Sequence, residues 1–255
     1  MQLPLSHGYK LLTYLNFIAS HDGVGLRPAE GLLSEWELET LIATMQRFGG
    51  RVSSRTTPDG KAKPYEINIS LWDALSGTVA NGPDEWQCAR YLCAAAVMAA
   101  LEGVPAYYIH SFVGTENDQE RVEHTGSFRS INRHIWDADE LEEKLSGDTH
   151  HARVFQALTN LLKIRRKQKA FHPNATMFTL HTGEQLFAFW RQSMDRRQSI
   201  FAIYNFSDRP QSLPLSELNL TLTDCWTDLI SGEKYEDRGA QLKLMPYQFV
   251  WLNNL

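Results

Sequence analysis

The 255-residue sequence is poor in cysteine, with Cys88, Cys93 and Cys225 as its three examples. Three cysteines cannot build a disulfide framework, and their spacing lacks the C-x-x-C pair that is typical of structural zinc sites. The first twelve residues, MQLPLSHGYKLL, also lack the charged segment and long apolar run of a signal peptide. We therefore expect a reduced, cytoplasmic protein without a metal site.

A long hydrophobic run and a basic block are missing as well. The longest apolar run, Ala94–Leu101, is far shorter than the roughly 20 residues that a membrane-spanning helix requires. Lys and Arg number 25 against 30 Asp and Glu, which gives a formal net charge of -5. The basic segment Lys163–Lys169 is better explained as the cationic last turn of a helix. These features predict neither a membrane nor a nucleic acid as a partner.

Residues 1–172 alternate predicted strands and helices. Two short apolar runs, 11–18 and 104–109, are typical of buried strands in a parallel sheet, because both faces of such a sheet are covered. Three helices are predicted, over residues 34–49, 84–101 and 151–170. Ser34 and Glu37 form a capping-box pattern at the start of the first helix, and Asp84 is placed to cap the second. The polar, turn-rich remainder is predicted to form loops over residues 51–65 and 110–134.

The pattern changes near residue 173 to short alternating segments separated by turns. They are typical of antiparallel strands and cover residues 177–181, 185–191, 199–206, 241–244 and 248–252. The sequence therefore predicts an α/β unit over residues 1–172 and an all-β unit, an antiparallel β-sandwich, over residues 173–255. A complete (β/α)8 barrel requires about 250 residues, so two strand/helix units cannot close one.

Polar residues that can bind a ligand follow each predicted parallel strand. His21 and Asp22 come directly after the first strand, at the end where ligands bind in α/β sheets. A carboxylate there can accept hydrogen bonds from sugar hydroxyls and a histidine can donate one, although Asp22 could instead cap a turn before Gly23. Arg133, in the loop after the second strand, could hold a phosphate or instead pin its loop to a carboxylate.

Four segments, in this order, resemble the α-amylase family of glycoside hydrolases (family 13). Within it they are most similar to the branch of sucrose phosphorylase and glucosylglycerate phosphorylase. The segments are Asn16–Gly25 (NFIASHDGVG), Pro64–Leu75, Gly103–His134 and Pro246–Leu252. The resemblance implies that residues 1–172 form barrel strands seven and eight with their loops and helices. It also implies that residues 173–255 form the family's C-terminal β domain.

The same resemblance implies roles for individual residues. Asp22 matches the transition-state stabiliser that holds the ring hydroxyls of the glucosyl unit, and His21 matches a neighbour that binds the same sugar. Tyr65 matches a residue of the acceptor site, and Arg133 matches an arginine of that site that can meet phosphate. Glu66, next to Tyr65, is counted with these substrate-binding residues.

The residues around the acceptor-site tyrosine depart from the pattern of sucrose phosphorylases. Lys63 and Glu66 stand where those enzymes carry Asp and Gln. This departure makes sucrose doubtful as the substrate and favours a glucosylglycerate-like α-glucoside.

The implied reaction is the transfer of glucose from a small α-glucoside to phosphate, with retention, to give α-glucose 1-phosphate. Phosphate is then a co-substrate, and neither a metal nor an organic cofactor is expected. Retaining transfer needs two carboxyl groups, and in this family they end barrel strands four and five, which precede strand seven. The acidic loop 116–123 is better explained as a solvated surface than as a substitute pair.

The chain is therefore expected to lack the nucleophile and the acid/base and to be inactive alone. A small glucoside, phosphate, and the missing N-terminal half of the barrel or a second copy of the chain are the expected partners. The alternatives are a non-catalytic remnant, a sugar-binding module, and a hydrolase of the α-glucosidase or amylase type.

Overall fold

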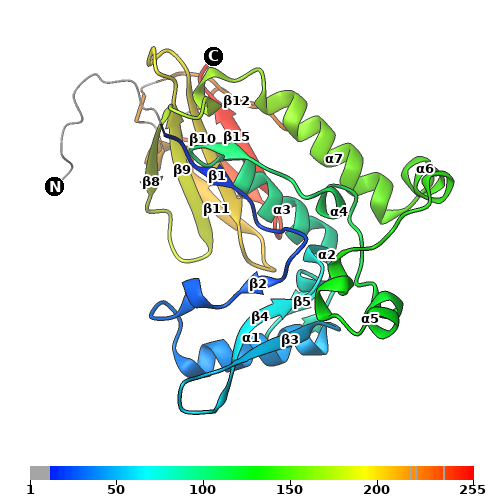
Figure 1. The fold of residues 1–255 in the computed structure, drawn as a ribbon. Helices are drawn as coiled ribbons and strands as arrows, with labels where there is room; N and C mark the ends of the chain where they lie inside the picture. The colour runs from blue at the N-terminus through cyan, green and yellow to red at the C-terminus, as the bar shows by residue number, and fades with distance from the viewer. Residues whose placement is uncertain (1–11, 219, 222, 238) are drawn as a thin grey trace.

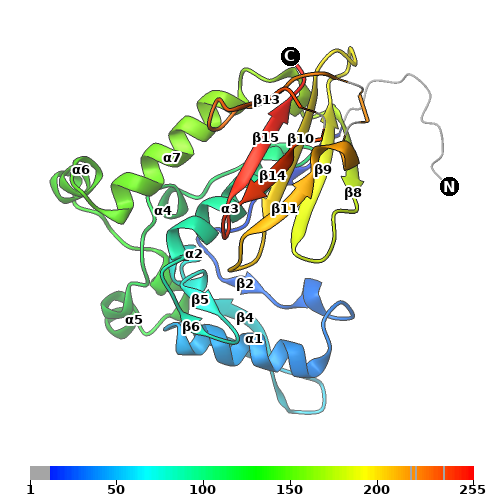
Figure 2. The same ribbon diagram turned by 180° about the vertical axis from the view of Figure 1, so that it is seen from behind.

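The computed structural model describes residues 12–218, 220–221, 223–237 and 239–255. A large antiparallel sheet packs against two long helices, α3 (Gln87–Ala100) and α7 (His150–Arg165) (Figures 1 and 2). A smaller layer, which contains α1 (Glu35–Arg47) and a three-stranded sheet, lies at the opposite end of the molecule (Figure 1). No helix in the described parts of the chain is long and apolar enough to cross a membrane.

The two predicted parallel strands pair in parallel, but they are much shorter than predicted. β1 (Leu15–Asn16) lies beside β7 (Val104–Pro105), with Leu15 opposite Val104. Residue 11 of the predicted buried strand 11–18 lies outside the described residues. The prediction that the rest of this strand is buried is wrong, since Leu12, Tyr14 and Phe17 are 84%, 66% and 57% exposed. Within the described residues β1 has one strand neighbour, so its other edge and its apolar side chains stay uncovered.

The segment 51–65, predicted as a loop, is mostly a β-hairpin. β3 (Arg51–Thr56) and β4 (Ala62–Asn68) are antiparallel, and β2 (Val24–Gly25) extends the sheet in the order β2-β4-β3. The predicted turn at residues 58–60 joins the two strands. The outer part of the hairpin is exposed on both faces, so it carries polar residues that resemble a loop sequence.

Helix α1 covers this small sheet and begins where the sequence predicts. The Ser34 hydroxyl accepts a hydrogen bond from the Glu37 N–H, and the Glu37 carboxylate accepts one from the Ser34 N–H, which confirms the capping box. Apolar residues of α1 and of the loop before η1 (Arg27–Ala29) pack on Ile67 and Ile69. This small core fixes the end of β4 that carries Glu66.

The middle of the chain contains more helix than predicted. The predicted loop 110–134 includes α4 (Ile109–Phe112), α5 (Gln119–Thr125) and the 3-10 helix η2 (Phe128–Asn132). Helix α6 (Ala138–Ser146), which was not predicted, is short and has no buried residue. The remaining short elements are α2 (Leu71–Ala74), β5 (Gly77–Thr78), β6 (Gly82–Pro83) and η3 (Lys169–Phe171).

Two helix limits differ from the prediction for local reasons. Helix α3 begins after Trp86, so Asp84 is not its cap. Instead the Asp84 carboxylate accepts a hydrogen bond from the Trp86 N–H and forms an ion pair with Arg90 at 2.6 Å. Helix α7 ends at Arg165 because the chain then turns and continues as η3.

The predicted antiparallel strands of the C-terminal part are confirmed. The six-stranded sheet has the order β13-β12-β15-β10-β9-β8, and β11 pairs with β14 in a second sheet. Leucines of the second sheet and of η4 (Leu215–Glu217) pack on Phe201, Ile203 and Val250 of the first. The strands are β8 (Thr176–Leu180), β9 (Leu186–Gln192), β10 (Ser199–Asn205), β11 (Gln211–Pro214), β12 (Trp226–Asp228), β13 (Lys234–Tyr235), β14 (Gln241–Leu244) and β15 (Phe249–Asn253).

The other face of the large sheet shares a core with α3 and α7. Alanines of α3 allow the helix to lie close to Tyr204 and Trp251. Trp251 Nε1 donates to the Tyr204 hydroxyl, which donates to the Ala96 carbonyl, both at 3.1 Å. Because the helices and the sheet bury one continuous apolar surface, the antiparallel sheet holds in place the helices that follow the parallel strands.

Candidate functional site

A charged cluster lies where the chain leaves β1. The Asp22 carboxylate atom Oδ1 is 3.0 Å from Arg133 Nη2, 3.3 Å from Arg129 Nη1 and 3.6 Å from His21 Nε2. The structure thus brings together three residues that the sequence selects, His21, Asp22 and Arg133. It adds Arg129, which the sequence analysis did not assign to the site.

Glu66 is the buried carboxylate of this cluster, and its side chain is 5% exposed. Arg129 donates to it twice, from Nε to Oε1 at 3.0 Å and from Nη2 to Oε2 at 2.7 Å. The Gly23 N–H and the Asn68 amide also donate to Oε1. Burial by itself would raise the pKa of Glu66, but these hydrogen bonds outweigh it and lower the pKa. Glu66 is therefore placed to hold Arg129 and the Asp22 loop rather than to contact a substrate.

Residues of η2 and of the loop after it hold the backbone of the Asp22 loop. Arg133 Nε donates to the His21 carbonyl at 2.9 Å, and the Asn132 amide donates to the Ser20 carbonyl at 2.5 Å. The Tyr108 hydroxyl in turn donates to the Asn132 carbonyl at 2.8 Å. These bonds fix the position of Asp22 before any ligand arrives, which reduces the cost of ordering the site on binding.

Gly23 is required by a close approach of two backbone segments. A Cβ atom at this position would lie 2.4 Å from the Ile67 carbonyl oxygen and 2.7 Å from the Glu66 side chain. The glycine after Asp22 therefore lets the loop sit against β4, where its N–H reaches Glu66.

A cavity of about 410 Å³ opens beside Asp22. It is mainly apolar, with polar groups at its edge, and residues that line it include Phe17, Ile18, Asp22, Gly23, Pro28 and Asn132. The side chains of His21 and Asp22 are 65% and 38% exposed, so both are accessible to a ligand. A larger cavity, of about 620 Å³, lies away from these charges, between α3, α7 and the turn before β15.

Tyr65 lies on β4, next to Glu66, and is exposed. Its phenol contributes, with Glu66 and Asp22, to the electrostatic surroundings that raise the pKa of Arg129, after the larger effect of the Glu66 hydrogen bonds. The predicted acceptor-site tyrosine is thus beside the charged cluster.

We expect Glu66→Gln to lower the free energy of unfolding by about 1–2 kcal/mol at pH 7, because Arg129 loses a charged partner and is itself partly exposed. The folded-state pKa of Glu66 lies below 4.5, so its contribution is present above that pH and is lost as the pH falls through the folded-state value. Urea unfolding at several pH values should therefore show the gap between wild type and variant closing in acid. Glu123→Gln, an exposed change in α5, is the control, and an equal pH-independent loss in both variants would contradict the assignment.

Comparison with known proteins gives the family context of this geometry. Residues 177–251 match the family described as Maltogenic Amylase, C-terminal domain. The glucosylglycerate phosphorylases of Allomeiothermus silvanus and Escherichia coli are each 35% identical to this chain, over 94% of its length. The chain is related to the C-terminal portion of α-amylase-family glucosyl phosphorylases. It spans 40% and 41% of the length of these two relatives.

A solved structure agrees with this relationship to the phosphorylases. The crystal structure of sucrose 6F-phosphate phosphorylase from Thermoanaerobacter thermosaccharolyticum matches 89% of this chain and 40% of its own, with a TM-score of 0.60. The identity is 20%, so this match concerns the fold alone. The resemblance that the four sequence motifs indicate is confirmed.

In this phosphorylase-related chain, Arg129, Asn68 and Asn132 are the site residues that the sequence analysis left without a role. All three are polar, and two of them are buried. A signal was present, since Arg129 and Arg133 lie four residues apart in one polar segment. Which arginine meets which carboxylate depends on β4, which is distant in the sequence.

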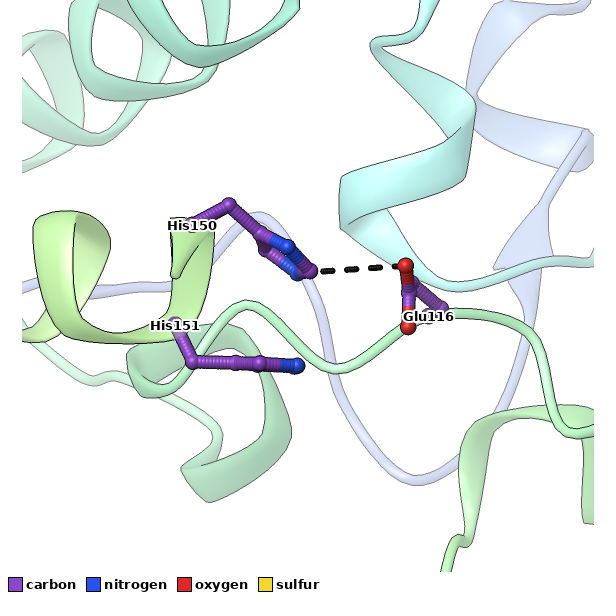
Figure 3. Close-up of side chains that lie close together, drawn as sticks. All are labelled: Glu116, His150 and His151. Carbon is purple, nitrogen blue, oxygen red and sulfur yellow. Dashed lines mark ion pairs between the residues drawn. The ribbon is translucent and has the colours of Figure 1, made fainter. Parts of the chain in front are cut away.

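A metal ion does not suit the Asp22 cluster, because two guanidinium groups already occupy the space around its carboxylate. A different group of the described residues can converge on a cation: Glu116, which precedes α5, with His150 and His151 at the start of α7 (Figure 3). The expectation of no metal site rests on the spacing of the cysteines, and this group contains no cysteine.

Proposed function

We propose that the chain supplies the sugar-binding end of a retaining α-glucosyl phosphorylase that acts on a glucosylglycerate-like α-glucoside. The observation that carries the proposal is Asp22, an accessible carboxylate held in the loop after β1 by Arg129 and Arg133. The 35% identity to two glucosylglycerate phosphorylases supports the substrate class. Lys63 and Glu66, where sucrose phosphorylases carry Asp and Gln, point away from sucrose.

The parallel strands take the place of the last two strands of a (β/α)8 barrel, with residues 1–172 as the partial barrel and 173–255 as the C-terminal β domain. Two observations support this assignment. β1 and β7 are parallel, and the apolar side chains beside them are uncovered, including Leu12, Tyr14 and Phe17. In a complete barrel such side chains are covered by the packed interior and by the outer ring of helices. The proposed partner for this face is the remaining part of the barrel, since the chain spans only 40% and 41% of the length of two glucosylglycerate phosphorylases.

Asp22 and Arg133 have different tasks in the proposed reaction. The closest contacts of Asp22 with both arginines are made by Oδ1, so Oδ2 is the oxygen that meets the ring hydroxyls of the glucosyl unit. His21, which is exposed beside it, binds the same sugar. Arg133 uses Nε and Nη2 within the protein, and its side chain is 40% exposed, so the rest of its guanidinium can bind phosphate. Phosphate then attacks the glucosyl-enzyme intermediate.

The two carboxyl groups that perform retaining transfer are supplied from outside these 255 residues. Glycosyl transfer with retention uses a pair about 5–5.5 Å apart, of which one is a nucleophile and the other an acid/base. Glu66 is unsuited to either task, because it is buried and its oxygens accept bonds from Arg129, Gly23 and Asn68. The chain alone is therefore inactive, and no metal or organic cofactor takes part in the proposed reaction.

A fusion tests this function. The part of the E. coli glucosylglycerate phosphorylase outside the matched region is joined to this chain, and glucose 1-phosphate is measured with glucosylglycerate and with sucrose. The fusion should release it only with phosphate and faster from glucosylglycerate, and the isolated chain should release none. Equally fast breakdown of the glucoside with and without phosphate would show that the fusion is a hydrolase. A fusion that unfolds cooperatively but is inactive, while the isolated chain binds glucosides, would favour a sugar-binding module.

In the active fusion, Arg133→Ala should chiefly raise KM for phosphate and increase the share of hydrolysis, because water then competes for the intermediate. Arg133→Lys should restore only part of the loss, since an ammonium group lacks the planar fork of guanidinium. Steady-state kinetics with varied phosphate measures both effects, and Arg197→Ala, an exposed change in the β9–β10 turn, is the control. An unchanged phosphate dependence in Arg133→Ala would remove this residue from the acceptor site.

A further inference from the structure

Three side chains with metal-binding atoms meet between the start of α7 and the segment before α5. One ligand atom from each of Glu116, His150 and His151 lies within 4.8 Å of the other two. The ends of both imidazoles and the carboxylate are directed toward the same space (Figure 3). Two histidines and one glutamate, with a fourth position for water, form a known donor set for Zn²⁺.

His151 is held in the orientation that a metal ligand requires. The side chain is buried, at 3% exposure, and its Nδ1 is 2.8 Å from the Val113 carbonyl oxygen. A proton on Nδ1 makes this hydrogen bond and leaves Nε2 with its lone pair. Metal-bound histidines commonly use one nitrogen for the ion and the other for a carbonyl or carboxylate. The edge of the ring also packs against Trp136, which restricts its rotation.

His150 is restrained by stacking. Its ring lies on Trp72 with the centroids 4.3 Å apart and an interplanar angle of 17°. His150 Nε2 is 3.0 Å from the Gly114 carbonyl oxygen and 4.0 Å from Glu116 Oε1. A metal ion at Nε2 replaces the proton shared with this carbonyl, and the stack keeps the ring in place.

Glu116 is exposed and carries a negative charge, and both properties suit a third metal ligand. Its side chain is 57% exposed, so it can shorten the distance to the histidines without disturbing the core. It also offsets the positive end of helix α7, which otherwise disfavours a cation beside His150 and His151. Asp73, which interacts electrostatically with both His150 and Glu116, adds to the same compensation.

We propose that Glu116, His150 Nε2 and His151 Nε2 form a binding site for Zn²⁺ or a similar divalent transition-metal ion, with one position open to solvent. The site is separate from Asp22 and takes no part in the proposed glucosyl transfer. Bound metal ties α7 to the segment before α5. That segment leads through α5 to η2 and Arg133, which hold the Asp22 loop. The ion is therefore a structural tie between the helix and the sugar-site loops.

The test uses the untagged chain and Zn²⁺ alone, measured by isothermal titration and by metal analysis after dialysis, with Co²⁺ as a spectroscopic probe. Wild type should bind one equivalent of Zn²⁺, and Co²⁺ should give visible absorption bands without the charge-transfer band of a thiolate ligand. Glu116→Gln and His150→Phe, which keeps the stack on Trp72, should each weaken Zn²⁺ binding at least about tenfold. Glu120→Gln, which changes an exposed acid in the first turn of α5, is the matched control and should bind as wild type does.

Three results would overturn the proposal. The first is the absence of stoichiometric binding at about 10⁻⁴ M Zn²⁺. The second is equal binding of Zn²⁺ by Glu116→Gln and wild type, and the third is a thiolate charge-transfer band, which would assign the metal to a cysteine. Circular dichroism and thermal unfolding of each variant without metal establish that it is folded. Loss of binding in a variant that unfolds at the wild-type temperature then reports the ligand itself.

Discussion

Asp22→Asn should lower kcat of the active fusion by about 10²–10⁴-fold, which corresponds to roughly 2.7–5.4 kcal/mol of transition-state stabilisation. Asparagine keeps the shape of aspartate and removes its charge. Hydrogen bonds from the sugar hydroxyls to a carboxylate strengthen as the ring approaches an oxocarbenium ion, so the loss falls mainly on the transition state. Steady-state kinetics of the fusion measures this effect, and KM for the glucoside should change less than kcat.

A structural explanation for such a loss must be separated from the catalytic one, because Asp22 also contacts Arg129 and Arg133. Asp139→Asn, an exposed change in the first turn of α6, is the matched control for loss of one carboxylate. Thermal unfolding of both variants shows whether the fold is intact. If a folded Asp22→Asn fusion keeps kcat within about threefold of wild type, then Asp22 is not the transition-state stabiliser.

The largest loss of stability is expected for Arg191→Met, at about 3–5 kcal/mol. Arg191 is fully buried on β9. Its guanidinium donates to the carbonyls of Ala100 at 2.5 Å, His172 at 2.9 Å and Ala175 at 3.4 Å. Burial lowers its pKa to about 10, which still leaves it charged at neutral pH. Methionine fills much of the same volume but leaves the carbonyls of His172 and of the buried residues Ala100 and Ala175 without this donor.

Urea unfolding at pH 7 measures the Arg191 effect. Arg197→Met removes an exposed arginine from the neighbouring turn and should change the free energy of unfolding by no more than about 0.5 kcal/mol. Arg191→Lys, which keeps a charge but reaches fewer carbonyls, should fall between wild type and Arg191→Met. A loss below about 1 kcal/mol in Arg191→Met would mean that water or a shift of the backbone replaces the missing bonds.

Those features of the protein that depend on neighbouring residues were predictable from the sequence. The alternation of apolar and polar residues in 241–244 predicts β14, because successive side chains of a strand point to opposite faces. β10 instead carries a run of apolar residues, and it is buried on both faces. Ser34 and Glu37 predict the start of α1, because both bonds of the capping box are local. The ordered motifs around Asp22 and Tyr65 indicate the phosphorylase relationship, since a motif is read directly from the residues.

Other features depend on contacts between distant segments, and the tertiary structure decided them. β1 and β7 are short because a strand extends only where a neighbour binds its backbone, and their apolar pattern says nothing of which neighbours are present. Glu66 supports the site rather than facing a ligand because β4 places it under Gly23 and beside Arg129. The sequence alone does not show whether this glutamate supports the site or contacts a ligand.

The convergence of Glu116 with His150 and His151 has the same origin. In the sequence these are an acidic loop residue and a pair of histidines at a helix start, and only the packing of α7 brings them together. Local patterns therefore determined the elements and the family, because hydrogen bonding along the chain and motif spacing are properties of neighbouring residues. Long-range packing determined which charges meet, because the distance between two side chains depends on every element that lies between them.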